Sequence, residues 1–337
     1  MPIEAQTKPI IICSDWKTEL SNCINSTDAL LKQLGLNSNT LKTSAQASTD
    51  FPIKVPQHYV KLMEYGNPED PLLKQVLPIQ AELAIDNNFS TDPVNESKYN
   101  PVPGIVHKYR NRVLMIISPA CAINCRYCFR RHFPYEENRQ SKQQWGKALD
   151  YLKSKPEINE VIYSGGDPLA ANDNFLSWLT QKIETIQHIK RLRIHTRLPV
   201  VIPSRIDNQL LDWLGNTRLK PTLVLHINHA NEIDSKLCHS VDQLKSIGIT
   251  VLNQSVLLKG INDSSQTLIN LSERLFDAGI MPYYLHTLDP VQGASHFDIP
   301  KEQALTIFHH IQSELPGFLV PKLVQEIAGK PSKSLIL

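Results

Sequence analysis

The pattern of hydrophobic and polar positions changes about a third of the way along the chain. Before that point, apolar residues at i, i+3, i+4 spacing occur in residues 20–36 and 56–78, where Asn, Pro and Gly interrupt them. This spacing predicts short helices joined by loops. Residues 37–50 and 87–104 are polar and contain Pro or Ser, which is typical of connecting segments.

From about residue 112, apolar β-branched runs alternate with amphipathic stretches. The runs predict strands at 112–118, 160–164, 191–197, 222–228, 249–258 and 281–288. The stretches between them predict helices at 141–153, 174–186, 208–215, 235–248 and 267–279. From residue 160 onward the strands start roughly every 30 residues, the length of one βα unit. Alternating strands and helices predict a parallel sheet, and six such units suffice for an open partial barrel but not for a closed eightfold one.

Polar side chains gather where the predicted strands end. They are Ser164, His195, Thr196, Asn228, His229, Asn253, Gln254 and His286. Any one of them could be a hydrogen-bonded structural group. Because barrels of this kind place their active sites at the carboxyl ends of the strands, their joint occurrence predicts a lined cavity.

Composition and charge are those of an ordinary globular protein. The 337 residues are 41% hydrophobic and carry a net charge of +2, so no strong field attracts nucleic acid or anionic lipid. No run approaches the roughly 20 apolar residues of a membrane span. Residues 1–17 contain an early acid and only a short apolar run, unlike a signal peptide. We therefore expect a cytoplasmic protein that binds neither nucleic acid nor membrane.

Three of the six cysteines lie within eight positions of the segment SPACAINCRYCFRRHF, residues 118–133. An odd group of thiols in a long chain does not indicate a disulfide framework. Structural zinc needs four ligands, and His132 is the nearby candidate for a fourth. Thiolates of Cys121, Cys125 and Cys128 on one tight loop better fit three corners of an iron–sulfur cube, with one iron left free. The loop arginines, expected to offset the thiolate charge, are Arg126, Arg130 and Arg131. The other cysteines, expected to be ordinary reduced thiols, are Cys13, Cys23 and Cys238.

The order C-x₃-C-x₂-C after a first strand, with aromatic Tyr127 before the last cysteine, resembles the radical S-adenosylmethionine (SAM) superfamily. The resemblance implies a [4Fe–4S] cluster whose free iron binds SAM and generates a 5′-deoxyadenosyl radical. The turn YSGGDPL, residues 163–169, is similar to the superfamily turn that holds the SAM amino group. It implies SAM contacts from Gly165, Gly166 and Asp167, because glycines allow close approach to a ligand.

Further segments are similar to the lysine 2,3-aminomutases. They include residues 67–78, 107–114, 125–133, 193–206 and 282–297. This resemblance implies an α/β fold with a partial (β/α)6 TIM-like barrel of the radical SAM type over residues 105–300. It also implies an N-terminal helical extension over 1–104 and a short C-terminal helix and lysine segment over 301–337. The implied enzyme is an isomerase that converts (S)-α-lysine into (R)-β-lysine with SAM and a pyridoxal 5′-phosphate (PLP) aldimine.

The same resemblance assigns ligand-binding residues. Lys108 and Arg112 correspond to two arginines that bind the PLP phosphate, although Lys108 lacks the planar guanidinium fork. Arg130 corresponds to the residue that pairs with the substrate carboxylate. Asp289 and Glu326 correspond to two aspartates at the distal ammonium of lysine, and Glu326 adds a methylene to that wall.

Two lysines compete for the covalent link to PLP. Lys330 follows a glycine and precedes a proline, as the family lysine does locally. Lys333 stands seven residues after Glu326, which keeps the family's acid-to-lysine spacing. We favour Lys333 as the catalytic lysine, with Lys330 as the alternative.

The segment LPGFLVPKLVQEIAGKPSK, residues 315–333, and the end of the chain four residues later are similar to the bacterial branch that modifies elongation factor P. That branch implies L-lysine as substrate, a ligase-like partner that attaches β-lysine to the factor, and a homo-oligomer. Two other functions remain open: a radical SAM enzyme of another class and a non-catalytic iron–sulfur protein.

Overall fold

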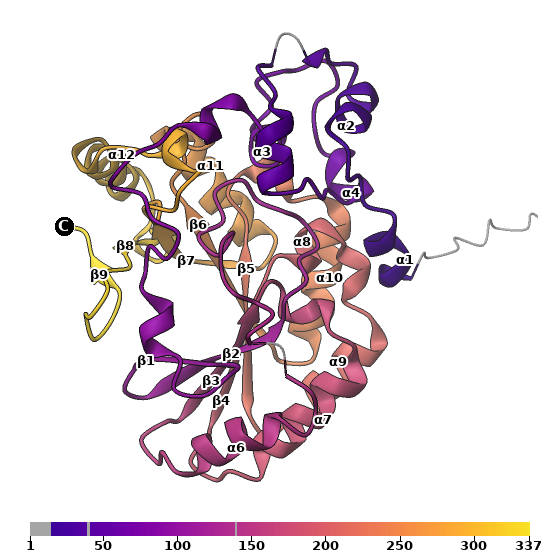
Figure 1. Ribbon diagram of the computed structural model, residues 1–337, viewed down its shortest axis with the longest axis vertical. Coiled ribbons are helices and arrows are strands. Elements are labelled where there is room, and N and C mark those ends of the chain that lie inside the picture. The colour runs from indigo at the N-terminus through magenta and orange to yellow at the C-terminus, as the bar shows by residue number, and fades with distance from the viewer. Residues whose placement is uncertain (1–14, 39–40, 139) are drawn as a thin grey trace, which may run out of the picture.

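The computed structural model describes residues 15–38, 41–138 and 140–337 (Figure 1). Cys13 and most of the segment compared with a signal peptide lie outside the described residues. In the described part of the chain, no helix is both long enough and apolar enough to cross a bilayer.

One sheet contains all the named strands in their sequence order. They are β1 (Ile105–Tyr109), β2 (Arg112–Ser118), β3 (Glu160–Gly165), β4 (Arg191–Thr196), β5 (Lys220–His226), β6 (Thr250–Val256), β7 (Met281–His286), β8 (Lys322–Gln325) and β9 (Ser334–Leu335). Strands β2 to β8 run parallel to one another, whereas β1 pairs antiparallel with β2 and β9 pairs antiparallel with β8 at the two edges. The sheet is therefore open, and the prediction of a partial barrel is confirmed.

The predicted strands are all present, but three further strands were not predicted. The family resemblance includes residues 105–109 in the barrel, but their sequence IVHKY shows no clear alternation that would predict a strand. Strands β8 and β9 have only 4 and 2 residues, too few for a periodic signal. The predicted segment boundaries fall at the starts of β1 at Ile105 and of α12 at Lys301.

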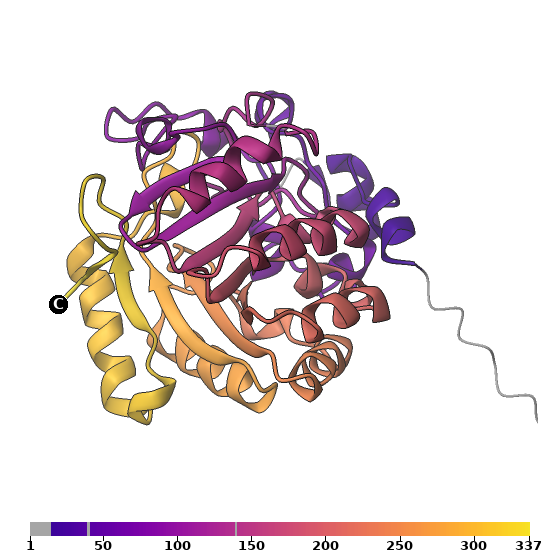
Figure 2. The ribbon, with the colours of Figure 1, turned by 90° about the horizontal axis from the view of Figure 1, so that it is seen from below.

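Helices follow most of the parallel strands and cover the outer face of the curved sheet (Figure 2). They are α6 (Trp145–Lys153), α7 (Asp173–Glu184), α8 (Leu198–Val201), α9 (Asn208–Gly215), α10 (Ser235–Ser246), α11 (Ser265–Asp277) and α12 (Lys301–Glu314). The sequence of α11 shows why these segments form helices that pack against the sheet. Ser264 caps its first turn by accepting from Thr267 N at 3.1 Å, and Leu268, Leu271 and Leu275 form its buried stripe.

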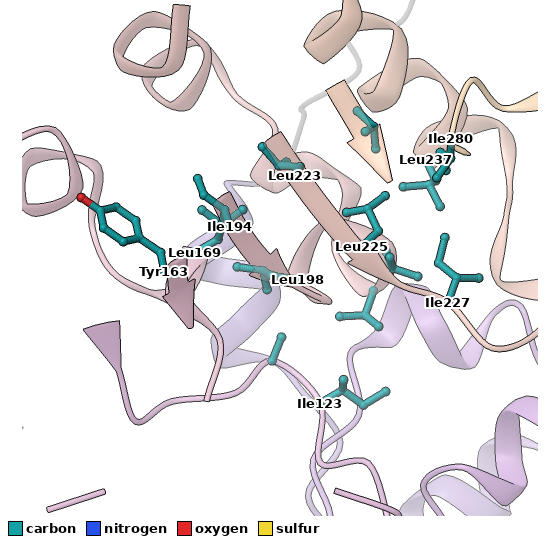
Figure 3. Packing of buried hydrophobic residues seen from close by; sticks show 14 of the residues in the cluster. Ile123, Tyr163, Leu169, Ile194, Leu198, Leu223, Leu225, Ile227, Leu237 and Ile280 are labelled. Carbon is teal, nitrogen blue, oxygen red and sulfur yellow. The ribbon is translucent and has the colours of Figure 1, made fainter. Parts of the chain in front are cut away.

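The period of two in each strand separates the core from the interior of the barrel. Ile194 on β4 and Leu223 and Leu225 on β5 point outward and pack in the main hydrophobic core (Figure 3). Their neighbours, such as His195 and His226, point the opposite way and line a cavity. Polar side chains on the inner face therefore meet around one space.

The N-terminal extension packs onto the barrel and shares its core. Its helices are α1 (Trp16–Ser21), α2 (Thr27–Gln33), α3 (Ala45–Asp50), α4 (Gln57–Val60) and α5 (Pro71–Lys74). Tyr59 and Leu72, both fully buried, belong to the same core cluster as Leu198 of α8 and Ile123 of the cysteine loop. Figure 3 shows Ile123 beyond the carboxyl ends of β4 and β5, so the extension and the cysteine loop meet at that end of the barrel.

Candidate functional site

A cavity of about 850 Å³ lies inside the curved sheet. The residues predicted to bind the cluster, the cofactors and the substrate all line it. They are Lys108, Arg112, Cys121, Cys125, Tyr127, Cys128, Arg130, Gly165, Gly166, Asp167, Asp289, Glu326 and Lys333. Lys330 is exposed and lies outside this lining, so the structure brings Lys333 rather than Lys330 to the other residues.

The polar residues at the strand ends divide by direction. Those that line the cavity are Ser164, His195, Thr196, Gln254 and His286. Asn253 does not, because it is adjacent to Gln254 on β6 and so points to the opposite face, where it bonds to Ile227. His229 caps a short turn, and Asn228 is buried among backbone and side-chain partners. The inward residue of β5 is His226, which sequence reasoning missed and which alternation along the strand could have found.

The cysteine loop folds as tight turns directly after β2. Cys128 N donates to Cys125 O at 3.0 Å, and Arg131 N donates to Cys128 O at 3.2 Å. Burial and the neighbouring Cys128 raise the pKa of Cys121, and burial and Cys125 raise the pKa of Cys128 to about 11. Thiols whose pKa is raised by burial and by each other ionise at neutral pH only where a positive charge stabilises their thiolates. Iron supplies that charge, so the donor set fits a metal cluster.

The geometry distinguishes a cluster from a single metal ion. Among the described residues, no three His, Cys, Asp or Glu side chains converge closely enough to hold one ion. Thiolates that bind different irons of a cube need not converge on one atom. His132, the alternative fourth zinc ligand, is exposed and its Nε2 lies 3.2 Å from Gln292 O. The thiols therefore fit a cube better than zinc.

Two of the loop arginines partly offset the thiolate charge as expected, because Arg130 and Arg131 lower the pKa of Cys128 against the effect of burial. All three loop arginines are also bound to glutamates of the N-terminal extension. Arg126 donates from Nε and Nη2 to Glu82 at 2.8 and 2.5 Å, and Arg131 donates to the same carboxylate at 3.0 Å. Arg130 forms a bidentate pair with Glu96 at 2.7 and 2.8 Å. These carboxylates are 34 to 49 residues from their partners, and sequence reasoning missed both.

The extension also holds the backbone of the cysteine loop. Lys54 donates from Nζ to Cys121 O at 2.7 Å, and its own carbonyl accepts from Asn124 N at 3.1 Å. Arg126 N donates to Gln75 O at 2.9 Å. The extension therefore fixes the loop at several points between the first and last cysteine.

The Gly-Gly turn after β3 lies against the start of the cysteine loop. A Cβ on Gly165, which has φ +125°, would stand 2.4 Å from Ser118 O, and one on Gly166 would stand 2.6 Å from Pro119 O. Only glycine fits such contacts. The turn is therefore packed between β2 and the loop, with no room for side chains.

Asp167 braces this turn instead of presenting a free carboxylate. It accepts from Leu169 N, Thr196 Oγ1, Arg197 N and Leu198 N at 2.7 to 3.0 Å. A carboxylate has about four lone-pair directions, and these donors use them. Contact with a ligand amino group at this turn would therefore come from main-chain carbonyls.

Elsewhere in the cavity, the Glu326 carboxylate contacts two lysine amines and one tyrosine hydroxyl. Lys333 Nζ lies 3.2 Å from one carboxylate oxygen and Lys108 Nζ lies 3.4 Å from the other. Tyr109 donates its hydroxyl at 2.7 Å. Burial alone would raise the pKa of Glu326, but Lys333, Tyr109 and Lys108 together hold it below its usual range. The Arg112 guanidinium lies 4.2 Å from the centre of the Tyr109 ring.

Asp289 faces the same region, but the nearby lysines do not outweigh the effect of its burial. Burial raises its pKa to about 6, an effect that Lys333 opposes and Glu326 reinforces. An acid in this state gains from a further cation close to it.

Three histidines also line the cavity. Burial lowers the pKa of His195 and His286 well below 6.5, and Lys333 is close enough to both to lower each further. Burial lowers the pKa of His226 to about 3, and its Nε2 lies 2.9 Å from Tyr127 OH. The wall between the thiols and Lys333 therefore carries neutral imidazoles at neutral pH.

Comparisons with known proteins agree with this geometry. Residues 115–271 match the Radical SAM superfamily. The chain is 52% identical to an L-lysine 2,3-aminomutase of Haemophilus influenzae over 95% of both chains, and 50% identical to that of Escherichia coli over 95% of this chain and 94% of the relative. It is 31% identical to the L-lysine 2,3-aminomutase of Clostridium subterminale over 96% of this chain and 78% of the relative.

Proposed function

The chain belongs to the L-lysine 2,3-aminomutase family of radical SAM proteins, and we propose that it moves the amino group of L-lysine from Cα to Cβ, converting (S)-α-lysine into (R)-β-lysine. It is thus an isomerase, an intramolecular aminotransferase. One observation carries the proposal. The thiols of Cys121, Cys125 and Cys128 and the amine of Lys333, more than 200 residues apart, line the same cavity. Few activities need a cluster and a reactive amine together.

The thiol end of the cavity suits a [4Fe–4S] cluster with SAM. Reductive cleavage of SAM at such a cluster supplies a 5′-deoxyadenosyl radical. Cys121, Cys125 and Cys128 would hold three irons, and the carbonyls of the Gly165–Gly166 turn would receive the SAM amino group. The neutral His226 and Tyr127 form the adjoining wall. Uncharged walls that exclude water protect a carbon radical from side reactions.

The amine end of the cavity suits PLP. PLP supplies an unsaturated carbon–nitrogen system through which an amino group can migrate. Lys333 would hold PLP, because its amine is in the cavity and that of Lys330 is not. Lys108 and Arg112 would bind the phosphate: Lys108 shares Glu326 with Tyr109, and Arg112 lies over the Tyr109 ring.

Charges at both ends of L-lysine are matched by the lining. Asp289 and Glu326 would bind the distal ammonium. Arg130 would bind the carboxylate: four of its five N–H donors bond to Glu96, Ser164 and Gly165, which leaves one for a ligand. The two ends together select a substrate with an acid group and an amine separated by a chain.

We further propose that the β-lysine serves the modification of elongation factor P in the cytoplasm, through a ligase that attaches it to that factor. The support is the similarity of residues 315–333 to that branch of the family. The 50% identity to the Escherichia coli relative over 94% of its length, against 31% to the clostridial one over 78%, is consistent with the shorter branch.

Chiral analysis of the product tests the proposal. The anaerobically reconstituted protein with dithionite, SAM, PLP and L-lysine is expected to form 5′-deoxyadenosine and (R)-β-lysine. 5′-Deoxyadenosine without β-lysine would indicate a radical SAM enzyme of another class, and neither product would indicate a non-catalytic iron–sulfur protein. Adding elongation factor P and its ligase then shows whether free β-lysine is the species transferred.

The lysine assignment has its own matched pair of variants. Lys333→Ala is expected to abolish the near-visible absorption band of bound PLP that borohydride removes, whereas Lys330→Ala should keep it. The opposite result would transfer the role to Lys330.

A further inference from the structure

Arg197 is a buried cation in direct contact with one cysteine sulfur. Its Nη1 lies 2.7 Å from Cys125 Sγ and 2.6 Å from Tyr127 OH. Its Nη2 donates to Glu232 Oε2 at 2.8 Å. Arg197 is 6% exposed and Glu232 is fully buried, so water screens neither charge effectively. The pair therefore forms a fixed dipole whose positive end meets the sulfur.

The remaining partners of this guanidinium belong to the N-terminal extension. Nη2 also donates to Gln75 Oε1 at 2.7 Å and to Tyr59 OH at 3.1 Å. Gln75 donates in turn to Glu232 Oε1 at 3.2 Å and accepts from the backbone of the cysteine loop. Three segments that are distant in sequence thus meet at Arg197: the extension, the end of β4 and the loop.

The backbone of Arg197 is held as firmly as its side chain. Its N–H donates to Asp167 Oδ2 at 2.7 Å, and Asp167 also receives the Thr196 hydroxyl. The guanidinium therefore projects from a braced strand end and reaches the sulfur from a fixed direction. A side chain anchored in this way can hold its partner in place as well as neutralise it.

We propose that Arg197 is a positioning residue that fixes Cys125 for cluster binding and, with Glu232, sets the reduction potential of the cluster. Hydrogen bonds to cluster sulfurs and positive charge close to them stabilise the reduced, more negative state and raise the potential. Glu232, on the far side of the guanidinium, moderates this effect. The inference rests on the proposed function only in requiring that the wild-type protein binds a cluster.

The charges predict effects of opposite sign. Arg197→Gln removes the cation and leaves Glu232 unpaired, so the potential should become more negative. Glu232→Gln leaves the cation uncompensated, so the potential should become less negative. In the double variant the two shifts should largely cancel. If Arg197 and Glu232 only stabilised the fold, their replacement would not shift the reduction potential in opposite directions.

The control is a second buried arginine–carboxylate pair, formed by Arg205 and Asp173. Arg205 donates to Asp173 at 2.8 Å, is fully buried and does not line the cavity. Arg205→Gln therefore reproduces the loss of a buried ion pair without changing the surroundings of the cluster, and it should leave the potential unchanged.

The measurement is an EPR-monitored redox titration of each anaerobically reconstituted protein, with iron content and SAM affinity determined in parallel. Opposite shifts in Arg197→Gln and Glu232→Gln, unaltered SAM affinity and no shift in Arg205→Gln would support the proposal. Unchanged potentials, or weaker SAM binding at an unchanged potential, would overturn it and make Arg197 a SAM ligand. A wild-type protein without a cluster would refute the proposed function instead.

The positioning role is tested separately with Arg197→Lys, which keeps the positive charge but lacks the planar guanidinium that bonds several partners at once. Loss of partners around metal ligands commonly costs 10- to 100-fold in metal affinity. The variant should lose iron to a chelator at least about 10-fold faster than the wild-type protein, at a nearly unchanged potential. Equal iron retention would overturn the positioning role. If Arg197→Gln holds no iron, the potential of Glu232→Gln and the rate of iron loss from Arg197→Lys still test the two parts of the proposal.

Discussion

Replacing Asp289 with asparagine is expected to stabilise the ligand-free protein while weakening its use of L-lysine. Burial raises the pKa of Asp289 to about 6 from the ordinary value of 3.8. A carboxyl with a raised pKa favours the fold while protonated, and this contribution is complete below pH 3.8 and lost as the pH rises through 6. At pH 8 the ionised form therefore costs about 2 pKa units at 1.4 kcal/mol each, or about 3 kcal/mol.

Asparagine does not ionise, so the variant avoids this cost. The gain in free energy of unfolding should be about 3 kcal/mol at pH 8 and about half of that at pH 5. Urea denaturation at both pH values measures it. The KM for L-lysine should rise at least about 30-fold, because losing one partner of a buried charge pair costs roughly 2 kcal/mol or more. These opposite effects separate the function of this carboxylate from its effect on stability.

Asp92→Asn is the matched control, because the pKa of Asp92 is shifted in the other direction. Burial raises it, but hydrogen bonds from Ser97 and from Glu96 N outweigh burial and leave the pKa below its usual range. Such a carboxylate stabilises the fold above its ordinary pKa, so this variant should be less stable at pH 8. If Asp289→Asn also lost stability at pH 8, or gained equally at both pH values, burial would not be the dominant influence on Asp289.

Two further predictions concern the attachment of the cysteine loop. Glu82→Gln leaves the buried Arg126 without its counterion, so the free energy of unfolding measured by urea denaturation should fall by about 3–5 kcal/mol. Asp150→Asn removes one partner of an exposed pair and should lower it by less than about 1 kcal/mol. Similar losses in both variants would refute the importance of burial. Gly166→Ala places a Cβ within 2.6 Å of Pro119 O, so we expect about 1–3 kcal/mol of strain and weaker SAM binding in equilibrium dialysis. Wild-type SAM affinity in this variant would show that the turn can move.

The sequence predicts the fold well in the segments where apolar residues recur at the spacing of a strand or a helix. The strands from residue 112 to 288 appear where apolar runs occur, because each must bury one face against helices. At the end of β6 the same periodicity separates Asn253, which bonds to Ile227 on the opposite face, from Gln254, which lines the cavity. The alternation is lost where a strand ends, because His195 and Thr196, the last residue of β4, both line the cavity.

The partners of the site residues could not be predicted, because they depend on tertiary packing. Glu82 and Glu96 lie in short 3-10 helices that no periodic pattern predicts, yet they bind the arginines that the sequence places beside the thiols. Arg197 looks like an ordinary strand-end residue until the fold brings Gln75 and Glu232 to it. Spacing predicts the three cysteines as a group because they share one loop, whereas the charged partners around them come from distant parts of the chain.

On the proposed function, the contacts of Lys333 account for how one pocket would serve both a lysine side chain and a lysine substrate. Lys333 is bound to Glu326 and lowers the pKa of Asp289. With Lys333 holding PLP, its amine would no longer be available to these acids, and Lys108 would bind the phosphate. Two carboxylates would then lack sufficient positive charge in a largely buried site, which would favour entry of an ammonium group. Loading of the cofactor would in this way create the binding site for the distal end of L-lysine, so lysine affinity should depend on PLP even where the two do not touch.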